Sequence, residues 1–329
     1  MPSTASRAGE FELIARHFAP LATGFPGAFG LGDDTARFAV PAGRDLVVTT
    51  DTLIEDVHFL AADPPDLVAR KCLRVNLSDL AAAGAVPLAY QLATAWPRDV
   101  DEAWIAAFAR GLAADQREFA IGLSGGDTAA TPGPKTITVT AFGTVAAGTG
   151  LSRAGARPGD AILVSGTIGD GALGLLGIRG ALAGLPPDAM IFLAERYRLP
   201  RPRCALGPRL PGIATAAIDV SDGLLADLGH LCERSGCGAT IEAAEVPLSP
   251  PARAALAADA GLLDTILGGG DDYELLFAVP AAEVARALAL ATPDVPLTAI
   301  GRFEPGRGVR ALRADGTALP PAAGGWQHF

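Results

Sequence analysis

Segments with the residue spacing of β-strands alternate with segments of helical spacing in both halves of this chain. In the first half, residues 45–50 and 135–145 have strand character, the second through alternating polar and apolar residues. Residues 66–83 and 101–119 instead carry apolar side chains at helical intervals. This alternation predicts an α/β or α+β architecture.

A loose segment divides the chain. Residues 148–159 are rich in Gly, Arg and Pro, and a new strand-like run, residues 161–164, follows them. A helical pattern over residues 222–233 belongs to this second half. Because 329 residues are many for one ordinary domain, we predict two domains, residues 1–148 and 149–329.

Shorter patterns predict further elements near the two ends of the chain. Residues 275–279 are expected to form a late strand and residues 281–291 a late helix. Residues 10–18 are expected to form an amphipathic helix whose apolar stripe consists of Phe11, Ile14, Ala15 and Phe18.

Composition excludes several classes of function. The formal net charge of -10 argues against a surface for nucleic acid or anionic membrane. With four histidines in the chain, we expect no zinc site. The N-terminus lacks the apolar core of a signal peptide, and no apolar run is long enough to span a bilayer, which predicts a cytoplasmic protein. Free thiols are expected at Cys72, Cys204, Cys232 and Cys237.

Six aspartate-bearing junctions carry the strongest functional signal. Any one of them alone is more often a turn or a helix N-cap. Together, and flanked by Gly, Ser or Thr, they suggest carboxylates that share cations, as in the binding of Mg²⁺ and a polyphosphate. The junctions are Gly32-Asp33-Asp34, Thr49-Thr50-Asp51, Asn76-Leu77-Ser78-Asp79, the predicted turn Gly125-Gly126-Asp127, Asp219-Val220-Ser221-Asp222 and Gly270-Asp271-Asp272.

Familiar ATP-binding motifs are missing. The chain contains neither the P-loop pattern nor the motif pairing of protein kinases, so metal ions would have to replace the usual lysine. Arg153 is a candidate phosphate contact, although a solvated linker arginine fits its position equally well. The glycine-rich stretch 165–171 could offer amide N–H groups to an anion, or could serve only close packing.

Two further residues have ambiguous roles on spacing alone. His58 follows Glu55-Asp56 and is more often a surface or core histidine than a ligand. Trp326 fits a hydrophobic plug better than a ring stacked on a ligand.

Eight motifs follow one another in a fixed order over nearly the whole chain: Gly32-Asp33-Asp34, Thr49–Leu53, His58-Phe59, Val75–Ala81, Gly125–Thr128, Arg153–Asp160, Ile218–Leu224 and Asp272–Leu275. This ordered set resembles the thiamine-monophosphate kinase family. The resemblance implies an N-terminal α/β domain that builds the ATP site and dimerises through its sheet, followed by a C-terminal α/β domain. It also implies ATP-dependent phosphorylation of thiamine monophosphate to thiamine diphosphate, the last step in making that cofactor.

The resemblance also implies a role for each matching position. Asp271 departs from the family, which commonly has Glu there, and Ala109 stands where a Tyr is frequent. ATP contacts are expected at Gly126, Asp127, Arg153 and Ser221, and contacts to thiamine monophosphate at His58, Asp271 and Trp326. Ligands for several Mg²⁺ ions are expected at Asp34, Thr49, Thr50, Asp51, Asp79, Asp127, Asp219 and Asp222.

Related functions remain as alternatives. A non-catalytic ATP or metal sensor on the same fold would bind ATP without releasing ADP. A metal-dependent phosphatase would release free phosphate. The family's sister enzyme selenophosphate synthetase uses a Cys and a Lys near its N-terminus, whereas the first such residues here are Lys71 and Cys72.

Overall fold

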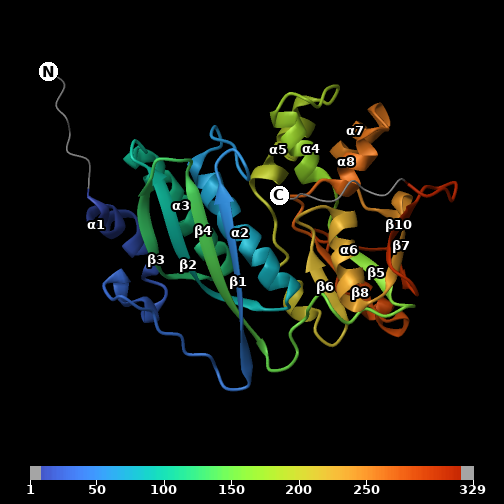
Figure 1. Ribbon diagram of the computed structural model, residues 1–329, viewed down its shortest axis with the longest axis horizontal. Helices are drawn as coiled ribbons and strands as arrows, with labels where there is room; N and C mark the ends of the chain where they lie inside the picture. Colours follow the sequence, from blue (N-terminus) through green and yellow to red (C-terminus); the bar gives the residue numbers. More distant parts are fainter. Residues whose placement is uncertain (1–8, 320–329) are drawn as a thin grey trace. The chain divides into compact units, whose positions relative to one another are not determined.

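The computed structural model describes residues 9–319, which fall into two compact units. Within the described part, the first unit comprises residues 9–42, 48–76 and 87–144. Residues 43–47, 77–86 and 145–319 form the second. Mixed α and β elements occur in both units, which confirms the predicted fold class (Figure 1). The domain boundary between residues 148 and 149 stays a prediction.

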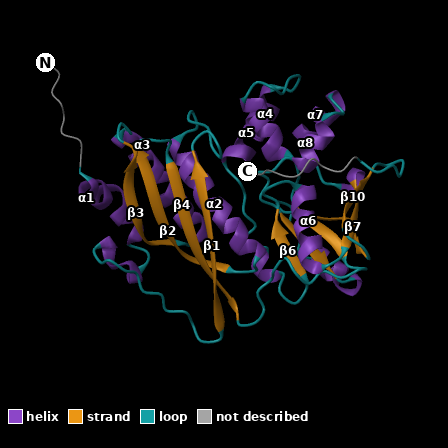
Figure 2. Ribbon diagram, in the orientation of Figure 1, coloured by secondary structure: helices purple, strands orange, loops and turns teal. Residues whose placement is uncertain are grey.

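The first unit is built on a four-stranded sheet with the strand order β1-β4-β2-β3. Strands β2 and β3 run parallel. The helices α2 and α3 lie along one face of the sheet (Figure 2). Four of these elements have one end in the second unit, at residues 44–47, 77–82, 86 and 145–146. The elements are β1 (Arg44–Ile54), α2 (Pro65–Ala82), β2 (Val86–Pro97), α3 (Glu102–Phe119), β3 (Gly122–Thr131) and β4 (Thr136–Ala146).

Helix α2 confirms the helical pattern predicted for residues 66–83. Its apolar stripe, Ala69, Leu73, Leu77 and Leu80, is fully buried. Two arginines of α2, Arg70 and Arg74, bond the buried carboxylate of Asp115 on α3 at 2.7 Å each. The pattern therefore identifies the buried face, and an ion-pair cluster ties the two helices together.

The predicted helix over residues 10–18 is only partly present. Helix α1 spans Glu10–Leu13 and continues into a π-helical turn, Ile14–Phe18. Leu13 and Phe18 are buried, whereas Phe11 is 82% exposed and Ala15 is exposed. The π turn adds a residue to each winding, so side chains five apart share a face and the predicted stripe does not form.

The predicted turn at Gly125–Asp127 is also wrong, because strand β3 runs through these residues. Opposite β2, Leu123 pairs with Tyr90 and Gly125 with Gln91, which leaves Ser124 as an extra residue. The Ser124 hydroxyl donates to the Tyr90 carbonyl oxygen at 3.0 Å. The two glycines thus mark a β-bulge in a continuous strand rather than its end.

The second unit contains a six-stranded sheet with the order β10-β7-β9-β5-β8-β6. Only β10 and β7 pair in parallel; the other neighbours are antiparallel. The strands are β5 (Ala161–Ser165), β6 (Ala216–Asp219), β7 (Gly238–Glu242), β8 (Leu275–Val279), β9 (Leu297–Glu304) and β10 (Gly308–Leu312). Strand β8 confirms the run predicted over residues 275–279.

Helices pack on this sheet through alternating side chains. Ile162 and Val164 of β5 belong to one apolar core, shared with the helices, while Leu163 between them belongs to a second core on the opposite face. The late helix is shorter than predicted, because residues 281–283 form a 3-10 turn before α9. The helices are α4 (Asp170–Ile178), α5 (Pro187–Arg198), α6 (Leu224–Ser235), α7 (Pro250–Ala258), α8 (Leu262–Gly268) and α9 (Val284–Leu288).

Candidate functional site

Strand β1 carries three of the predicted metal ligands, Thr49, Thr50 and Asp51. The Thr50 hydroxyl donates to the Val139 carbonyl oxygen at 3.1 Å and lies 3.0 Å from the Thr140 hydroxyl on β4. Such contacts fix the side chain of Thr50 on the sheet. Asp51 is half-buried at the same end of the strand.

Gly126 and Asp127 lie on β3, at the other edge of the same sheet. A Cβ at Gly126 would collide with the Leu92 backbone, so this position needs glycine for strand pairing. The Asp127 side chain is exposed and accepts a bond from the amide of Thr128 at 2.9 Å. Because β4 and β2 stand between, Asp51 and Asp127 are separated within one chain by three strand spacings, roughly 14 Å.

Asp34 and His58 occupy loops of the first unit. Asp34 is exposed in the segment before β1. The Nδ1 atom of His58 accepts from the backbone N–H of Ile54 at 3.0 Å, and Lys71 donates to the His58 carbonyl oxygen at 3.0 Å. Because Nδ1 accepts, the neutral ring carries its proton on Nε2, which makes that atom a donor.

Asp79 is half-buried on α2, three residues after Asn76. Asn76 is fully buried, and its Nδ2 donates to the Cys72 carbonyl oxygen at 3.0 Å. Its Oδ1 has no hydrogen-bond partner among the described residues, and neither has the buried hydroxyl of Ser78. Because a buried amide oxygen is costly to leave unpaired and oxygen is the donor that Mg²⁺ prefers, this helix face fits a hard cation.

In the second unit, three predicted residues lie at the end of one strand or just after it. Asp219 is the buried last residue of β6, and Ser221 and Asp222 lie in the loop that follows. The carboxylate of Asp227 on α6 accepts the backbone N–H groups of Ser221 and Asp222, at 3.0 Å each. Asp227 therefore fixes the loop that presents Ser221 and Asp222.

Asp227 and His230 are residues that the sequence reasoning missed. In the described part of the chain, ligand atoms of Asp222, Asp227 and His230 lie within 4.8 Å of one another. Burial and the charge of Asp222 raise the pKa of Asp227 to about 7. The two backbone hydrogen bonds that Asp227 accepts and the charge of Arg153 lower this pKa, but by less. The available signal was the spacing of Asp227 and His230, which lie three residues apart on α6 and so share a face.

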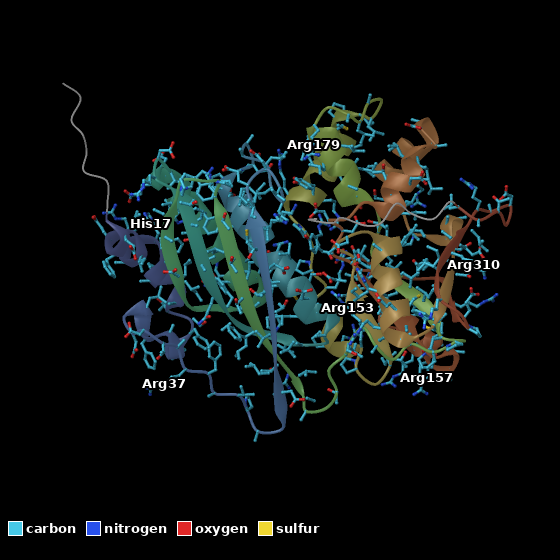
Figure 3. All side chains as sticks on the ribbon, viewed as in Figure 1. His17, Arg37, Arg153, Arg157, Arg179 and Arg310 are labelled. Atoms are coloured by element: carbon cyan, nitrogen blue, oxygen red, sulfur yellow. The ribbon has the colours of Figure 1, made fainter. Side chains whose placement is uncertain are left out.

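Arg153 lies in the loop before β5 and is labelled in Figure 3. Its carbonyl oxygen accepts from the Ser235 hydroxyl at 3.2 Å, and its side chain is exposed. Because its guanidinium lowers the pKa of Asp227, Arg153 acts on the same group that holds the Ser221-Asp222 loop. The structure thus relates Arg153, Ser221 and Asp222 within one unit.

Asp271 lies beside this loop as well. Its backbone N–H donates to the Ser221 carbonyl oxygen at 2.9 Å, and its carboxylate accepts from the Tyr273 hydroxyl at 3.1 Å. Asp271 is therefore in the same part of the second unit as Asp222. The remaining predicted substrate contact, Trp326, lies outside the described residues.

The glycine-rich stretch 165–171 already has an anion from the protein itself. The buried carboxylate of Asp272 accepts the backbone N–H groups of Gly169 at 2.8 Å and Gly171 at 3.1 Å, at the start of α4. Burial raises the pKa of Asp272 well above its ordinary value, although these two bonds oppose the shift. Of the two interpretations left open by the sequence, the packing role fits, because these donors serve an internal carboxylate.

The structure also bears on the cysteines and on the question of a membrane span. The four cysteines all lie in the described region and form no disulfide bond. Burial raises the pKa of the Cys232 thiol to about 12, which makes it unreactive at neutral pH. None of the helices within residues 9–319 combines the length and apolar character needed to span a bilayer.

Comparison with known families defines the class of protein. Residues 32–145 match the N-terminal domain of AIR synthase related proteins, and residues 157–313 match the C-terminal domain. Together these matches cover most of the chain, so both halves have the architecture of that class.

Individual relatives are more specific. The thiamine-monophosphate kinase of Caulobacter vibrioides is 45% identical over 323 residues, which cover 97% of this chain and 90% of the relative. A crystal structure of the Stenotrophomonas maltophilia enzyme of the same name has a TM-score of 0.80 and 44% identity, covering 88% of this chain and 91% of that one. The structure "AaThiL complexed with AMPPCP and TMP" has a TM-score of 0.77 and 32% identity, and the match covers 92% of this chain and 97% of that one. The chain belongs to the thiamine-monophosphate kinase family.

Proposed function

We propose that this protein transfers the γ-phosphoryl group of ATP to the phosphate of thiamine monophosphate, giving thiamine diphosphate and ADP. The observation that carries the proposal is the 45% identity to a thiamine-monophosphate kinase over nearly the full length of both chains. A relative bound to AMPPCP and TMP supports ATP and thiamine monophosphate as the two substrates. This reaction is the last step in making thiamine diphosphate.

The acceptor needs no general base. A phosphate monoester has a second pKa near 6 and is largely dianionic at neutral pH, so its oxygen can attack directly. In the transfer, a bond forms between an acceptor oxygen and the γ-phosphorus while the bond to the β-phosphate oxygen breaks. Both reactants are anions, so the protein must position them in line and neutralise their charge.

Mg²⁺ would supply that charge neutralisation, and the donor set fits it because every predicted ligand offers an oxygen atom. In the first unit we assign Asp34, Thr49, Thr50, Asp51 and Asp127 to metal binding. In the second we assign Asp79, Asp219 and Asp222. The unpaired Oδ1 of Asn76, three residues before Asp79, supports a cation at that helix face.

Direct substrate contacts complete the proposal. Gly126, Asp127, Arg153 and Ser221 are assigned to ATP, with Arg153 as a phosphate donor. His58, Asp271 and Trp326 are assigned to thiamine monophosphate. The carboxylate of Asp271 suits the permanently charged thiazolium ring of thiamine, and the Nε2–H of His58 can donate to an acceptor oxygen.

A coupled assay tests the reaction. Purified protein with ATP, MgCl₂ and thiamine monophosphate should form ADP and thiamine diphosphate in equal amounts, and EDTA should stop both. Thiamine in place of thiamine monophosphate is the matched control and should give no product. Binding of ATP without ADP release would instead identify a sensor, and free phosphate without thiamine diphosphate would identify a phosphatase.

We also propose a homodimer formed through the four-stranded sheet. Two observations support it: the large apolar side chains of Leu46 and Val48 are exposed on β1, and the ligands of β1 and β3 stand at opposite edges of one sheet. A second copy would give each edge a partner. Sedimentation at micromolar concentration should show two chains, and Val48→Asp should shift the protein toward one. A wild-type monomer would refute the dimer.

Cytoplasmic location remains a prediction from the sequence.

A further inference from the structure

A buried ionic cluster adjoins the turn formed by residues 270–273 in the second unit. Arg196 of α5 is 4% exposed, and its Nη2 donates to Oε1 of Glu274 at 3.2 Å and to the carbonyl oxygen of Asp272 at 3.3 Å. Arg203 also pairs with Glu274, through an Nε to Oε2 bond of 2.5 Å. The Ser165 hydroxyl donates to the same carboxylate at 2.6 Å. Arg196 therefore bonds two residues of one short segment.

That segment holds a conformation that its residues disfavour. The φ angles of Asp271 and Tyr273 are +66° and +54°, in the left-handed region that side-chain-bearing residues rarely adopt. Such residues persist in this region where their surroundings fix them. Here the backbone N–H groups of Asp271 and Tyr273 donate to Ser221 and Val220, at 2.9 and 2.8 Å.

Side chains anchor the turn on both sides of Tyr273, next to the half-buried Asp271. Asp272 bonds the first turn of α4, and Glu274 is held by the two arginines. Between these anchors, the Tyr273 hydroxyl bonds Oδ1 of Asp271 at 3.1 Å. Both the backbone and the side-chain direction of Asp271 are thus determined by contacts within the second unit.

We propose that the Arg196–Glu274 pair, with Asp272 and Tyr273, is a positioning device that holds the Asp271 carboxylate ready for thiamine monophosphate. The proposal rests on the proposed function, in which Asp271 contacts this substrate. A group that is already oriented loses little conformational freedom when its ligand binds. The cluster therefore acts on the affinity for thiamine monophosphate and leaves ATP affinity and the transfer step largely unchanged.

Steady-state kinetics of Tyr273→Phe and Arg196→Lys provide the test. Tyr273→Phe removes one hydrogen bond to a charged group and should raise KM for thiamine monophosphate about tenfold. KM for ATP and kcat should stay within about twofold. Arg196→Lys keeps the charge but is shorter and lacks the planar guanidinium, so its KM should lie between the wild-type value and that of Arg196→Gln.

Ser249→Ala is the matched control, because the Ser249 hydroxyl bonds Asp170 in the same buried cluster at 2.5 Å without touching the turn. It should lower Tm and leave KM for thiamine monophosphate unchanged. The proposal is overturned if the turn variants change only Tm, or if Ser249→Ala raises that KM equally. Should Arg196→Lys fail to fold, Tyr273→Phe decides alone. If the wild-type protein makes no thiamine diphosphate, the proposed function itself has failed.

Discussion

Asp127 in the first unit and Asp272 in the second both belong to Gly-Asp motifs, yet the carboxylate of Asp127 is exposed and that of Asp272 is buried. Asp127 is exposed on β3, and its carboxylate accepts from the next residue's amide. Asp272 is 1% exposed and accepts two amides at the start of α4, with Arg196 close by. The same motif therefore yields a carboxylate open to a cation from solution in one unit and an internal anchor in the other.

The difference shows what decides the role of an acidic residue. A buried carboxylate needs hydrogen-bond donors or cations from the protein itself, and the second unit supplies them from α4, Arg196 and Arg203. An exposed carboxylate bears no such cost and can receive a metal ion with little rearrangement. Substitutions at the two kinds of position should therefore separate activity from stability.

The largest effect is expected for Asp127→Asn. Removing a negative charge that we assign to Mg²⁺ and ATP should lower kcat/KM at least about 100-fold, while Tm stays near that of the wild type because the side chain is exposed. The coupled assay and a thermal melt measure both. Asp99→Asn, an exposed aspartate of the same unit, should change neither. Near-wild-type turnover of Asp127→Asn would remove the metal assignment.

Asp272→Ala should show the opposite behaviour. It leaves the buried amides of Gly169 and Gly171 without an acceptor, so the free energy of unfolding should fall by about 2–4 kcal/mol. Urea denaturation measures this change. Asp127→Ala is the comparison and should cost less than about 0.5 kcal/mol. If both variants lost the same free energy of unfolding, the burial of Asp272 and the exposure of Asp127 would make no difference to stability.

A smaller effect on stability is expected for Gly126→Ala. The added methyl group would collide with the Leu92 backbone and disturb the pairing of β2 and β3, at a cost of about 1–3 kcal/mol. Gly24→Ala serves as the control, because a Cβ there meets no atom within 4 Å. If Gly126→Ala is as stable as the wild type but inactive, the glycine serves substrate approach alone.

The smallest effect is the pH dependence caused by Asp272. Burial raises its pKa in the folded state, so the folded protein keeps this proton to a higher pH than the unfolded chain. Its contribution to stability is full below about pH 4, the ordinary pKa of Asp, and declines as pH rises through the folded pKa. The stability advantage of the wild type over Asp272→Asn should therefore narrow as the pH rises above about 4 in urea titrations. If this stability difference instead grew with rising pH, the pKa of Asp272 would be lowered on folding, contrary to our inference.

Regular patterns could be predicted from the sequence, and interrupted ones could not. The stripe of α2 and the alternation of β4 extend over enough residues to identify their buried faces, and both are confirmed. The π turn after α1 and the bulge at Ser124 each insert one residue, which no periodic pattern reveals. Strands β7 and β10 went unpredicted because glycine and polar residues interrupt their short apolar runs, whereas β5 and β8, which are equally short, are almost continuously apolar.

The residues of the candidate site also divide into those that the sequence could identify and those that it could not. Motif order alone identified the family and the acidic positions, because the oxygen ligands and glycines stand at fixed places along the chain. Asp227 could not be found, because its role is to bind the amides of Ser221 and Asp222, a contact that exists only once α6 has folded. Arg196 escaped notice because an arginine inside a helix is ordinarily a solvated residue.

The sequence by itself therefore determined the α/β class and the family, and it supplied the aspartates that we propose for metal binding. Only the tertiary structure decided which acidic residues are neutralised internally, as Asp272 and Glu274 are, and which remain exposed, as Asp127 does. The physical reason is that the state of a carboxylate depends on its burial and on the donors around it. Residues far apart in the chain, such as Gly169, Arg196 and Arg203, supply those donors only after folding.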